Sequence, residues 1–328
     1  MSAADSDLRP VPARSEPAAS GVPPLQRLVD RAFRSTVLAC AVLVILLVVA
    51  IVYEVMVRAW PAIDKWGLDF LTQSKWDPNS SSFGVLAEIA GTLYTSFLAL
   101  IGGGVLGISV ALVTSQGFLS ARWELVLKNV IELLAAIPSV VYGLWGIFVL
   151  IPAIRPVANA LHESLGFLPF FATPFKGPGI LPSALVLSIM ILPTVTAVSR
   201  EALAAVPARL PAAAYGLGAT QWEVIWSVML PTASGGVFGS LVLGLGRALG
   251  ETMALAMLVG NAQAYGWSLL SPGTTLAALL ANHFPEAGEI EVQALMYAAL
   301  LLLLITLAVN VLGTWIMLRT TRQLRGLG

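Results

Sequence analysis

Six long apolar stretches constrain this chain more than any other feature. They run over about Val37–Val57, Ala90–Thr114, Leu125–Ile151, Gly179–Val198, Gly235–Val259 and Val292–Leu318. Each is close to the roughly 20 residues that a helix needs to cross the apolar core of a bilayer. Hydrophobic residues make up 57% of the 328 residues and charged residues only 11%, which is more apolar surface than a soluble domain needs. The sequence therefore predicts an all-α polytopic membrane protein with six transmembrane helices.

The rest of the composition excludes several function classes. The formal net charge is zero, so nucleic acid is not expected as a partner. Cys40 is the single cysteine and is expected to be a small buried hydrophobe, while His162 and His283 lie too far apart in sequence to predict a metal site. No GxxxxGK[ST] motif occurs, so we expect no nucleotide site and no cofactor. No grouping of nucleophile, base and metal predicts an enzyme.

The N-terminal region differs from the rest of the chain. Residues 1–34 begin with a stretch rich in Pro, Ala and Ser that is typical of a disordered tail, and residues 35–328 form the predicted transmembrane domain. The first apolar stretch is too long for a signal peptide and is interpreted as a retained anchor. Lys and Arg gather in the tail, in alternate loops and at the C-terminus, which predicts that both termini are cytoplasmic.

Backbone-breaking and small residues predict how the spans pack. Glycines crowd the second and fifth spans and favour close helix contacts. Pro138 and Pro193 are expected to kink the third and fourth spans. Trp60, Trp66 and Trp76 lie in the first outer loop and are typical of an interfacial aromatic belt or of a docking face for a partner.

A long loop over about 199–233 joins the fourth and fifth spans on the predicted cytoplasmic side. Its first helix is alanine-rich and ends at Gly216 and Gly218, and Thr220 and Glu223 have the spacing of a capping box that starts a second helix. The second helix is expected to end at Pro231. Such a loop suits docking of a partner protein, and an amphipathic loop lying on the membrane is the alternative.

Two charged residues fall inside the fifth span. Arg247 and Glu251 are four residues apart, so a continuous helix would place them on one face. Burying each charge costs about 2.5–3.5 kcal/mol, which calls for a reason. Either they neutralise each other structurally, or Arg247 offers its guanidinium to a passing oxyanion while Glu251 orients it. Lys128 and Glu132 in the third span are interpreted as a structural pair.

The loop carries a recognisable spacing. Ala212, Ala213 and Ala214, then Gly218, then Leu230 and Pro231 resemble the EAA-x3-G-x9-I-x-L-P loop of ABC-importer permeases, although Ala212 stands where that family has Glu. The segments IELLAAIPSVVYGLWG, AAYGLGATQWEVIWSVMLP and GLGRALGETMA are similar to PstC-type permease subunits of bacterial phosphate importers. The resemblance covers all six spans.

This resemblance implies the fold of a type I ABC-importer permease in the inner membrane, with the loop docked on an ATPase. It also implies the partners, namely a second, PstA-type permease, a dimer of PstB-type ATPases, a PstS-type phosphate-binding protein and membrane lipid. A permease for sulfate or molybdate is the nearest alternative. An ion-coupled secondary transporter, which needs no ATPase, and a structural membrane scaffold are the others.

Overall fold

A computed structural model of the chain describes residues 24–263 and 266–325, so most of the predicted disordered tail lies outside it. The chain divides into two compact units, one up to Tyr53 and one from Glu54 onward. Helix α1 (Pro24–Trp66) begins within the stretch that the sequence had assigned to the tail. Cys40 on α1 is exposed, which corrects the prediction of a buried thiol. In a membrane helix, lipid can surround an apolar side chain as well as protein can.

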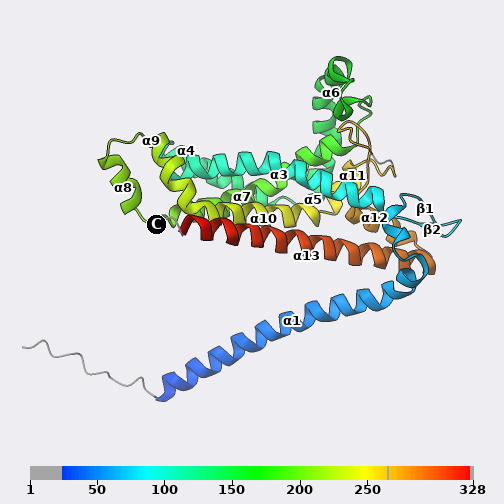
Figure 1. Cartoon of the computed structure of the whole chain (residues 1–328), viewed down its shortest axis with the longest axis horizontal. Coiled ribbons are helices and arrows are strands. Elements are labelled where there is room, and N and C mark those ends of the chain that lie inside the picture. Colours follow the sequence, from blue (N-terminus) through cyan, green and yellow to red (C-terminus); the bar gives the residue numbers. More distant parts are fainter. Residues whose placement is uncertain (1–23, 264–265, 326–328) are drawn as a thin grey trace, which may run out of the picture. The chain divides into compact units, whose positions relative to one another are not determined.

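The second unit contains the remaining elements, drawn in Figure 1. The helices are α2 (Asp69–Thr72), α3 (Leu86–Ser115), α4 (Ala121–Ala136), α5 (Ser139–Trp145), α6 (Ile151–Leu165), α7 (Ile180–Ala204), α8 (Arg209–Gly216), α9 (Gln221–Val224), α10 (Leu230–Leu249), α11 (Met253–Leu258), α12 (Leu276–His283) and α13 (Glu289–Arg325). Strands β1 (Trp76–Asp77) and β2 (Ser82–Phe83) pair antiparallel, a small addition to the predicted all-α fold.

Within the described residues, six helical segments are long and apolar enough to cross a membrane, as predicted. They are Leu28–Trp66, Leu86–Ser115, Ser139–Leu165, Ile180–Ala204, Gln221–Leu249 and Glu289–Arg319. The third segment lies later in the chain than expected, because α4 ends at Ala136 and Ile137 is extended. Proline disfavours helical backbone in the residue before it, so Pro138 breaks this helix. Pro193, in contrast, lies inside the uninterrupted α7.

Two helices pass through a proline by forming a π turn before it. Residues 146–150 precede Pro152 in this way, and residues 225–229 precede Pro231. The Leu230 N–H bonds to the Ile225 carbonyl, five residues back. A proline has no N–H and its ring displaces the carbonyl four residues earlier, so a local shift to wider turns lets the helix continue. The predicted end of the second loop helix at Pro231 is therefore wrong, and one helical segment runs from Gln221 to Leu249.

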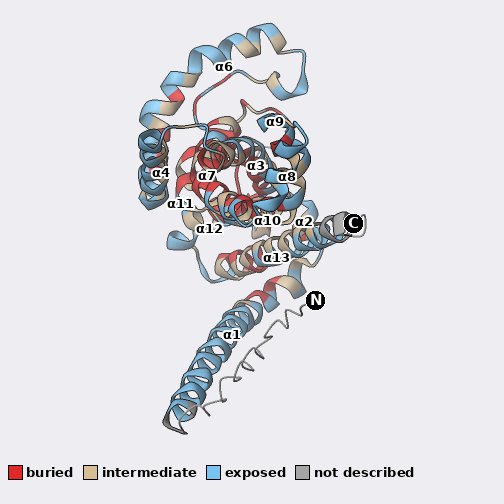
Figure 2. Ribbon diagram, turned by 90° about the vertical axis from the view of Figure 1, so that its left-hand side faces the viewer, coloured by how far each residue is buried: buried red, intermediate tan, exposed pale blue. Residues whose placement is uncertain are grey.

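Helix α7 is the most buried of these segments and packs against α3 and α10 (Figure 2). Small residues let α3 and α7 approach closely, as the glycine pattern predicts. The Ser188 hydroxyl donates to the Ala99 carbonyl at 3.2 Å, and the Thr196 hydroxyl donates to the Gly107 carbonyl at 3.1 Å. Between α7 and α10, the hydroxyls of Ser199 and Ser240 bond at 2.7 Å. These contacts pack the three helices into one bundle.

A second cluster joins the β-hairpin to α12 and α13. Trp76 is only 6% exposed, and its indole N–H donates to a Glu291 oxygen at 2.9 Å. The same oxygen lies 3.1 Å from Nδ1 of His283. Trp76 is thus a core residue and not part of a surface belt, whereas Trp60 is 63% exposed.

Candidate functional site

The predicted site residues lie at a break between two helices, within the stretch that the sequence predicts as the fifth span. Helix α10 ends at Leu249, Gly250 follows as its cap, and a new short helix, α11, begins at Met253. The sequence predicted one helix over Gly235–Val259 with Arg247 and Glu251 on a shared face. That part of the prediction is wrong, because Arg247 lies in the last turn of α10 and Glu251 lies outside both helices.

The two charges are compensated separately. Arg247 is exposed and lies at the carboxyl end of α10, where the helix dipole is negative. Glu251 is half-buried, and its Oε1 accepts the backbone N–H of Ala254 at 3.4 Å in the first turn of α11. Among the described residues, no ion pair within 4.0 Å joins Arg247 to Glu251. In this arrangement, Arg247 and Glu251 do not form the pair that a continuous helix would allow.

A second helix break, between α4 and α5, lies close to this one. Tyr142 on α5 and Ala254 on α11 belong to one buried cluster, with Leu134 and Ile137 from the region of the Pro138 break packed against it. The Tyr142 hydroxyl donates to the Leu134 carbonyl at 2.8 Å and lies within electrostatic range of Arg247. Interrupted helices with free backbone groups are characteristic of substrate sites in membrane transporters. The two interruptions therefore mark this region as the candidate pathway.

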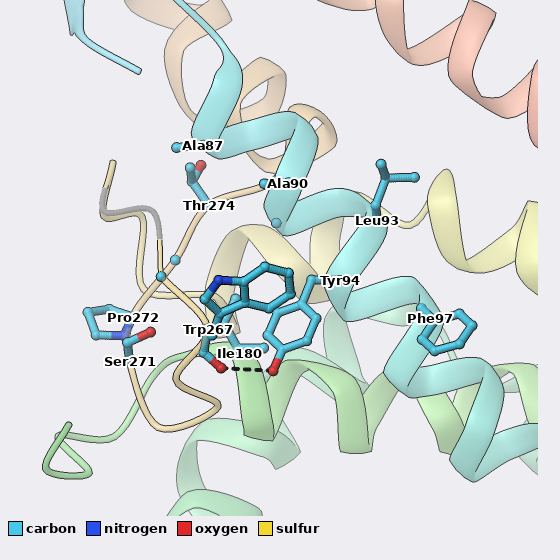
Figure 3. A pocket seen from close by; sticks show the side chains of 13 residues that line it. Ala87, Ala90, Leu93, Tyr94, Phe97, Ile180, Trp267, Ser271, Pro272 and Thr274 are labelled. Carbon is cyan, nitrogen blue, oxygen red and sulfur yellow. Dashed lines mark hydrogen bonds between the residues drawn. The ribbon is translucent and has the colours of Figure 1, made fainter. Parts of the chain in front are cut away.

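An apolar cavity of about 350 Å³ lies elsewhere, between α3, the start of α7 and the 266–274 loop (Figure 3). The Tyr94 hydroxyl donates to the Trp267 carbonyl at 2.9 Å across it. None of its described lining residues is charged. An oxyanion would find no counter-charge there, so this cavity is not the candidate anion site.

Glu88 is a residue that sequence reasoning missed. It lies in the first turn of α3 with its side chain fully buried. Neither carboxyl oxygen has a hydrogen-bond partner among the described residues. The local sequence gives one indication of this position, because the helix dipole favours an acidic residue in the first turn of a helix. It gives none that the side chain is buried.

The long loop forms the exposed hairpin that the sequence predicts. Ala212, Ala213 and Gly218 are exposed, and Gly218 has φ +86 with open space around it. The predicted capping box is confirmed, with the Thr220 backbone N–H bonded to Glu223 at 2.7 Å and the Glu223 N–H bonded to the Thr220 hydroxyl. Leu230 and Pro231 are half-buried and lie at the start of α10.

The predicted pair of Lys128 with Glu132 is wrong. Lys128 bonds instead to Glu124 at 2.5 Å, one turn earlier on α4. Glu124 and Glu132 are each four positions from Lys128, so either could pair with it on a helix. An acidic residue four positions before a lysine is more favourable than one four positions after it.

Comparison with known proteins identifies the family. The model of the binding-protein-dependent transport system inner membrane component matches residues 103–326. The chain belongs to this family. It is therefore a multi-pass inner membrane protein without an ATPase domain, and an importer permease of this kind works with a separate ATPase and a binding protein.

Several curated relatives are similar over nearly their whole length. The phosphate transport system permease protein PstC of Pasteurella multocida is 39% identical, over 90% of this chain and 94% of the relative. The protein of the same name from Haemophilus influenzae is 39% identical, over 92% and 96%. A probable PstC protein of Methanocaldococcus jannaschii is 31% identical, over 90% and 95%.

Solved structures share the fold. A chain of a bacterial alginate ABC transporter, solved in complex with a pentasaccharide-bound periplasmic protein, matches with a TM-score of 0.60 over 90% of this chain and 98% of its own length, at 16% identity. A chain of the inward-facing MetNI methionine ABC transporter matches with a TM-score of 0.53 over 72% and 96%, at 18% identity. These likenesses confirm the ABC-importer permease fold.

Proposed function

We propose that this chain is the transmembrane permease subunit of an ATP-driven phosphate importer and forms half of the translocation pathway. The choice of phosphate is supported by the PstC relatives at 37–39% identity. A pathway that contains arginine suits a tetrahedral oxyanion, because the planar guanidinium can donate two parallel hydrogen bonds.

One observation carries the mechanism. A single helical segment, Gln221–Leu249, begins in the exposed hairpin and has Arg247 in its last turn. A partner that moves the hairpin therefore moves the segment that holds the guanidinium. A continuous, packed element of this kind can carry coupling between a docking surface and a substrate site.

Arg247 and Glu251 have complementary roles in this proposal. Arg247 attracts the anion, while the fixed negative charge of Glu251 limits how tightly the anion is held. Conduction requires binding that is favourable enough for entry and weak enough for release. Arg247 lies just before the break at 250–252, and Glu251 lies within it.

The hairpin is the proposed contact with the ATPase. Ala212, Ala213, Ala214 and Gly218 present little side-chain bulk, so a partner can approach the backbone, and Leu230 with Pro231 carries the displacement into α10. The full assembly contains a PstA-type second permease, a dimer of PstB-type ATPases and a PstS-type phosphate-binding protein. The distribution of Lys and Arg supports a cytoplasmic position for both termini and for this hairpin.

Reconstitution tests the proposal. The chain is co-expressed with the three partner types, and the complex is purified and placed in liposomes with phosphate-loaded binding protein outside. We expect ATP-dependent phosphate uptake that excess sulfate or molybdate does not inhibit. Uptake of sulfate or molybdate in place of phosphate would contradict the assigned substrate, and uptake without any ATPase would contradict the importer class.

A further inference from the structure

The hairpin of α8 and α9, here called the coupling hairpin, makes a contact that the family motif does not include. Helix α3 ends at Ser115, and the turn over residues 116–120 leads into α4. The side-chain amide of Gln221, the first residue of α9, donates to the main-chain carbonyl of Gln116 at 2.9 Å. The ring of Phe118 lies against Trp222 with centroids 5.6 Å apart and an interplanar angle of 37°. The start of α9 is thus attached to the end of α3.

The packing below this contact supports a mechanical connection. Ala111 on α3, Leu203 on α7, Val224 on α9 and Ala233 on α10 share one buried cluster, and Ala214 of the hairpin packs against it. Deeper in the bundle, α3 is fixed to α7 by the two hydroxyl bonds to main-chain carbonyls described above. A displacement of α9 is therefore transmitted to α3 and α7 as well as to α10.

We propose that Gln221 and Phe118 are positioning residues that fasten the coupling hairpin to the α3–α4 turn, so that α9 and α3 move as one body when the ATPase acts. This inference rests on the proposed importer function. Without this contact, the hairpin could still bend the Gln221–Leu249 segment at its π turn while α3 stayed in place. Part of each ATP-driven movement would then fail to open the pathway.

The first test compares variants in the reconstituted complex by ATP hydrolysed per phosphate transported. Gln221→Glu keeps the side-chain shape and is favourable at the start of a helix, but it replaces the amide that donates to Gln116 with a carboxylate, which cannot donate. Phe118→Ala removes the ring contact with Trp222. We expect each variant to raise the ratio of ATP hydrolysed to phosphate transported by about two- to tenfold, which is the range expected for the loss of one such contact. The level of the subunit in the membrane should not change. Trp222→Phe keeps a ring pair and is expected to match the parent, whereas Trp222→Ala is not.

Matched controls come from the same region. Gln116→Ala leaves the accepting carbonyl in place, because that carbonyl belongs to the main chain, and it removes a side chain that bonds to the Ser115 hydroxyl. Trp123→Ala removes an aromatic side chain of α4 that is 66% exposed and has no ring partner among the described residues. Both controls should keep the parental ratio. If Gln221→Glu and Phe118→Ala also keep it while phosphate is transported, the positioning role is refuted and the importer function stands.

A cross-link gives an independent test. Cys40 is the only native cysteine, so Cys40→Ser provides a background for the pair Gln116→Cys and Gln221→Cys. If α9 and α3 move together, bridging the two thiols with a short bifunctional methanethiosulfonate, which forms reducible disulfides, preserves phosphate uptake. Bridging should also lower the ratio of ATP hydrolysed to phosphate transported, which the loss of the Gln221 amide has raised. Uptake that is lost on bridging and recovered on reduction would show that the two elements move apart, which overturns the proposal.

Discussion

Replacing Gly103 with alanine tests whether close packing of α3 on α7 stabilises the protein. A Cβ at this position would lie 2.6 Å from the main-chain carbonyl oxygen of Ser188 and 2.9 Å from Cδ1 of Ile191. Ordinary contacts of this kind are about 3.4 Å or longer. The carbonyl belongs to a helix backbone and cannot rotate away, so α3 and α7 would have to separate by nearly 1 Å.

The expected loss can be estimated from three contributions. Overpacking a close-packed interface costs about 1–3 kcal/mol. Separation would also weaken the bonds from Ser188 to Ala99 and from Thr196 to Gly107, worth about 0.6 kcal/mol each in a membrane. Alanine regains about 1 kcal/mol through its higher helix propensity. The net destabilisation is therefore about 1–3 kcal/mol, or a fall of about 2–4 °C in the unfolding midpoint of a chain of 328 residues.

Thermal unfolding of the detergent-solubilised complex measures this effect, with Gly239→Ala as the matched control. Gly239 is also in a helix, and its added Cβ would meet only the Met317 sulfur at an ordinary 3.5 Å. This control should unfold at or slightly above the parental temperature. If Gly103→Ala were as stable as Gly239→Ala, the close approach of α3 and α7 would not be a source of stability.

Three further predictions address the hairpin, the pathway and the β-hairpin. Gly218→Asp should abolish transport while the subunit keeps its normal level in the membrane, and the uncharged Gly218→Asn, which tolerates the same positive φ, should have a milder effect. Uptake by Gly218→Asp equal to that of the parent would argue against docking at this position. Arg247→Ala should reduce phosphate uptake by orders of magnitude, Arg247→Lys should recover part of it and Glu251→Gln should slow turnover; a double Arg247→Ala, Glu251→Ala variant with parental uptake would identify a structural pair instead. Hydrogen bonds from Ser80 and then Lys75 lower the pKa of Asp77 from 3.8 to about 2. Because this pKa is depressed, the stabilisation is present above pH 3.8 and is lost as the pH falls through about 2; an NMR titration midpoint near 4 would show that these bonds are absent in solution.

Local signals in the sequence were sufficient where a few neighbouring residues determine the structure. The capping box at Thr220 and Glu223 forms as its spacing predicts, and Gly218 adopts a positive φ after a short helix. The six apolar spans follow in the same way from composition and length. The sequence did not indicate that a π turn would let the helix continue through Pro231. The free-energy cost of a proline inside a helix depends on what the helix packs against, and the local sequence does not contain that information.

The break at Gly250 is set by contacts that are distant in the sequence. Nothing between Arg247 and Met253 forbids a helix, since the stretch contains no proline. The end of α11 is instead held by two loops: the Gly179 N–H donates to the Leu258 carbonyl at 2.8 Å, and the Gly273 N–H donates to the Val259 carbonyl at 2.8 Å. These bonds fix α11 in a position that a straight continuation of α10 need not reach. Periodicity in one span contains no information about them.

The break changes how the two charges are to be understood. A spacing of four residues indicates a shared face only while the helix is continuous, and here Glu251 is bonded to the Ala254 N–H and not to Arg247. A charge at the centre of a span costs about 2.5–3.5 kcal/mol, whereas a helix end supplies only about 0.3–1 kcal/mol to a cation in its last turn, such as Arg247. In the proposed importer, an anion in the pathway would be the counter-charge of Arg247, and for this reason we expect Arg247→Ala to lower phosphate uptake.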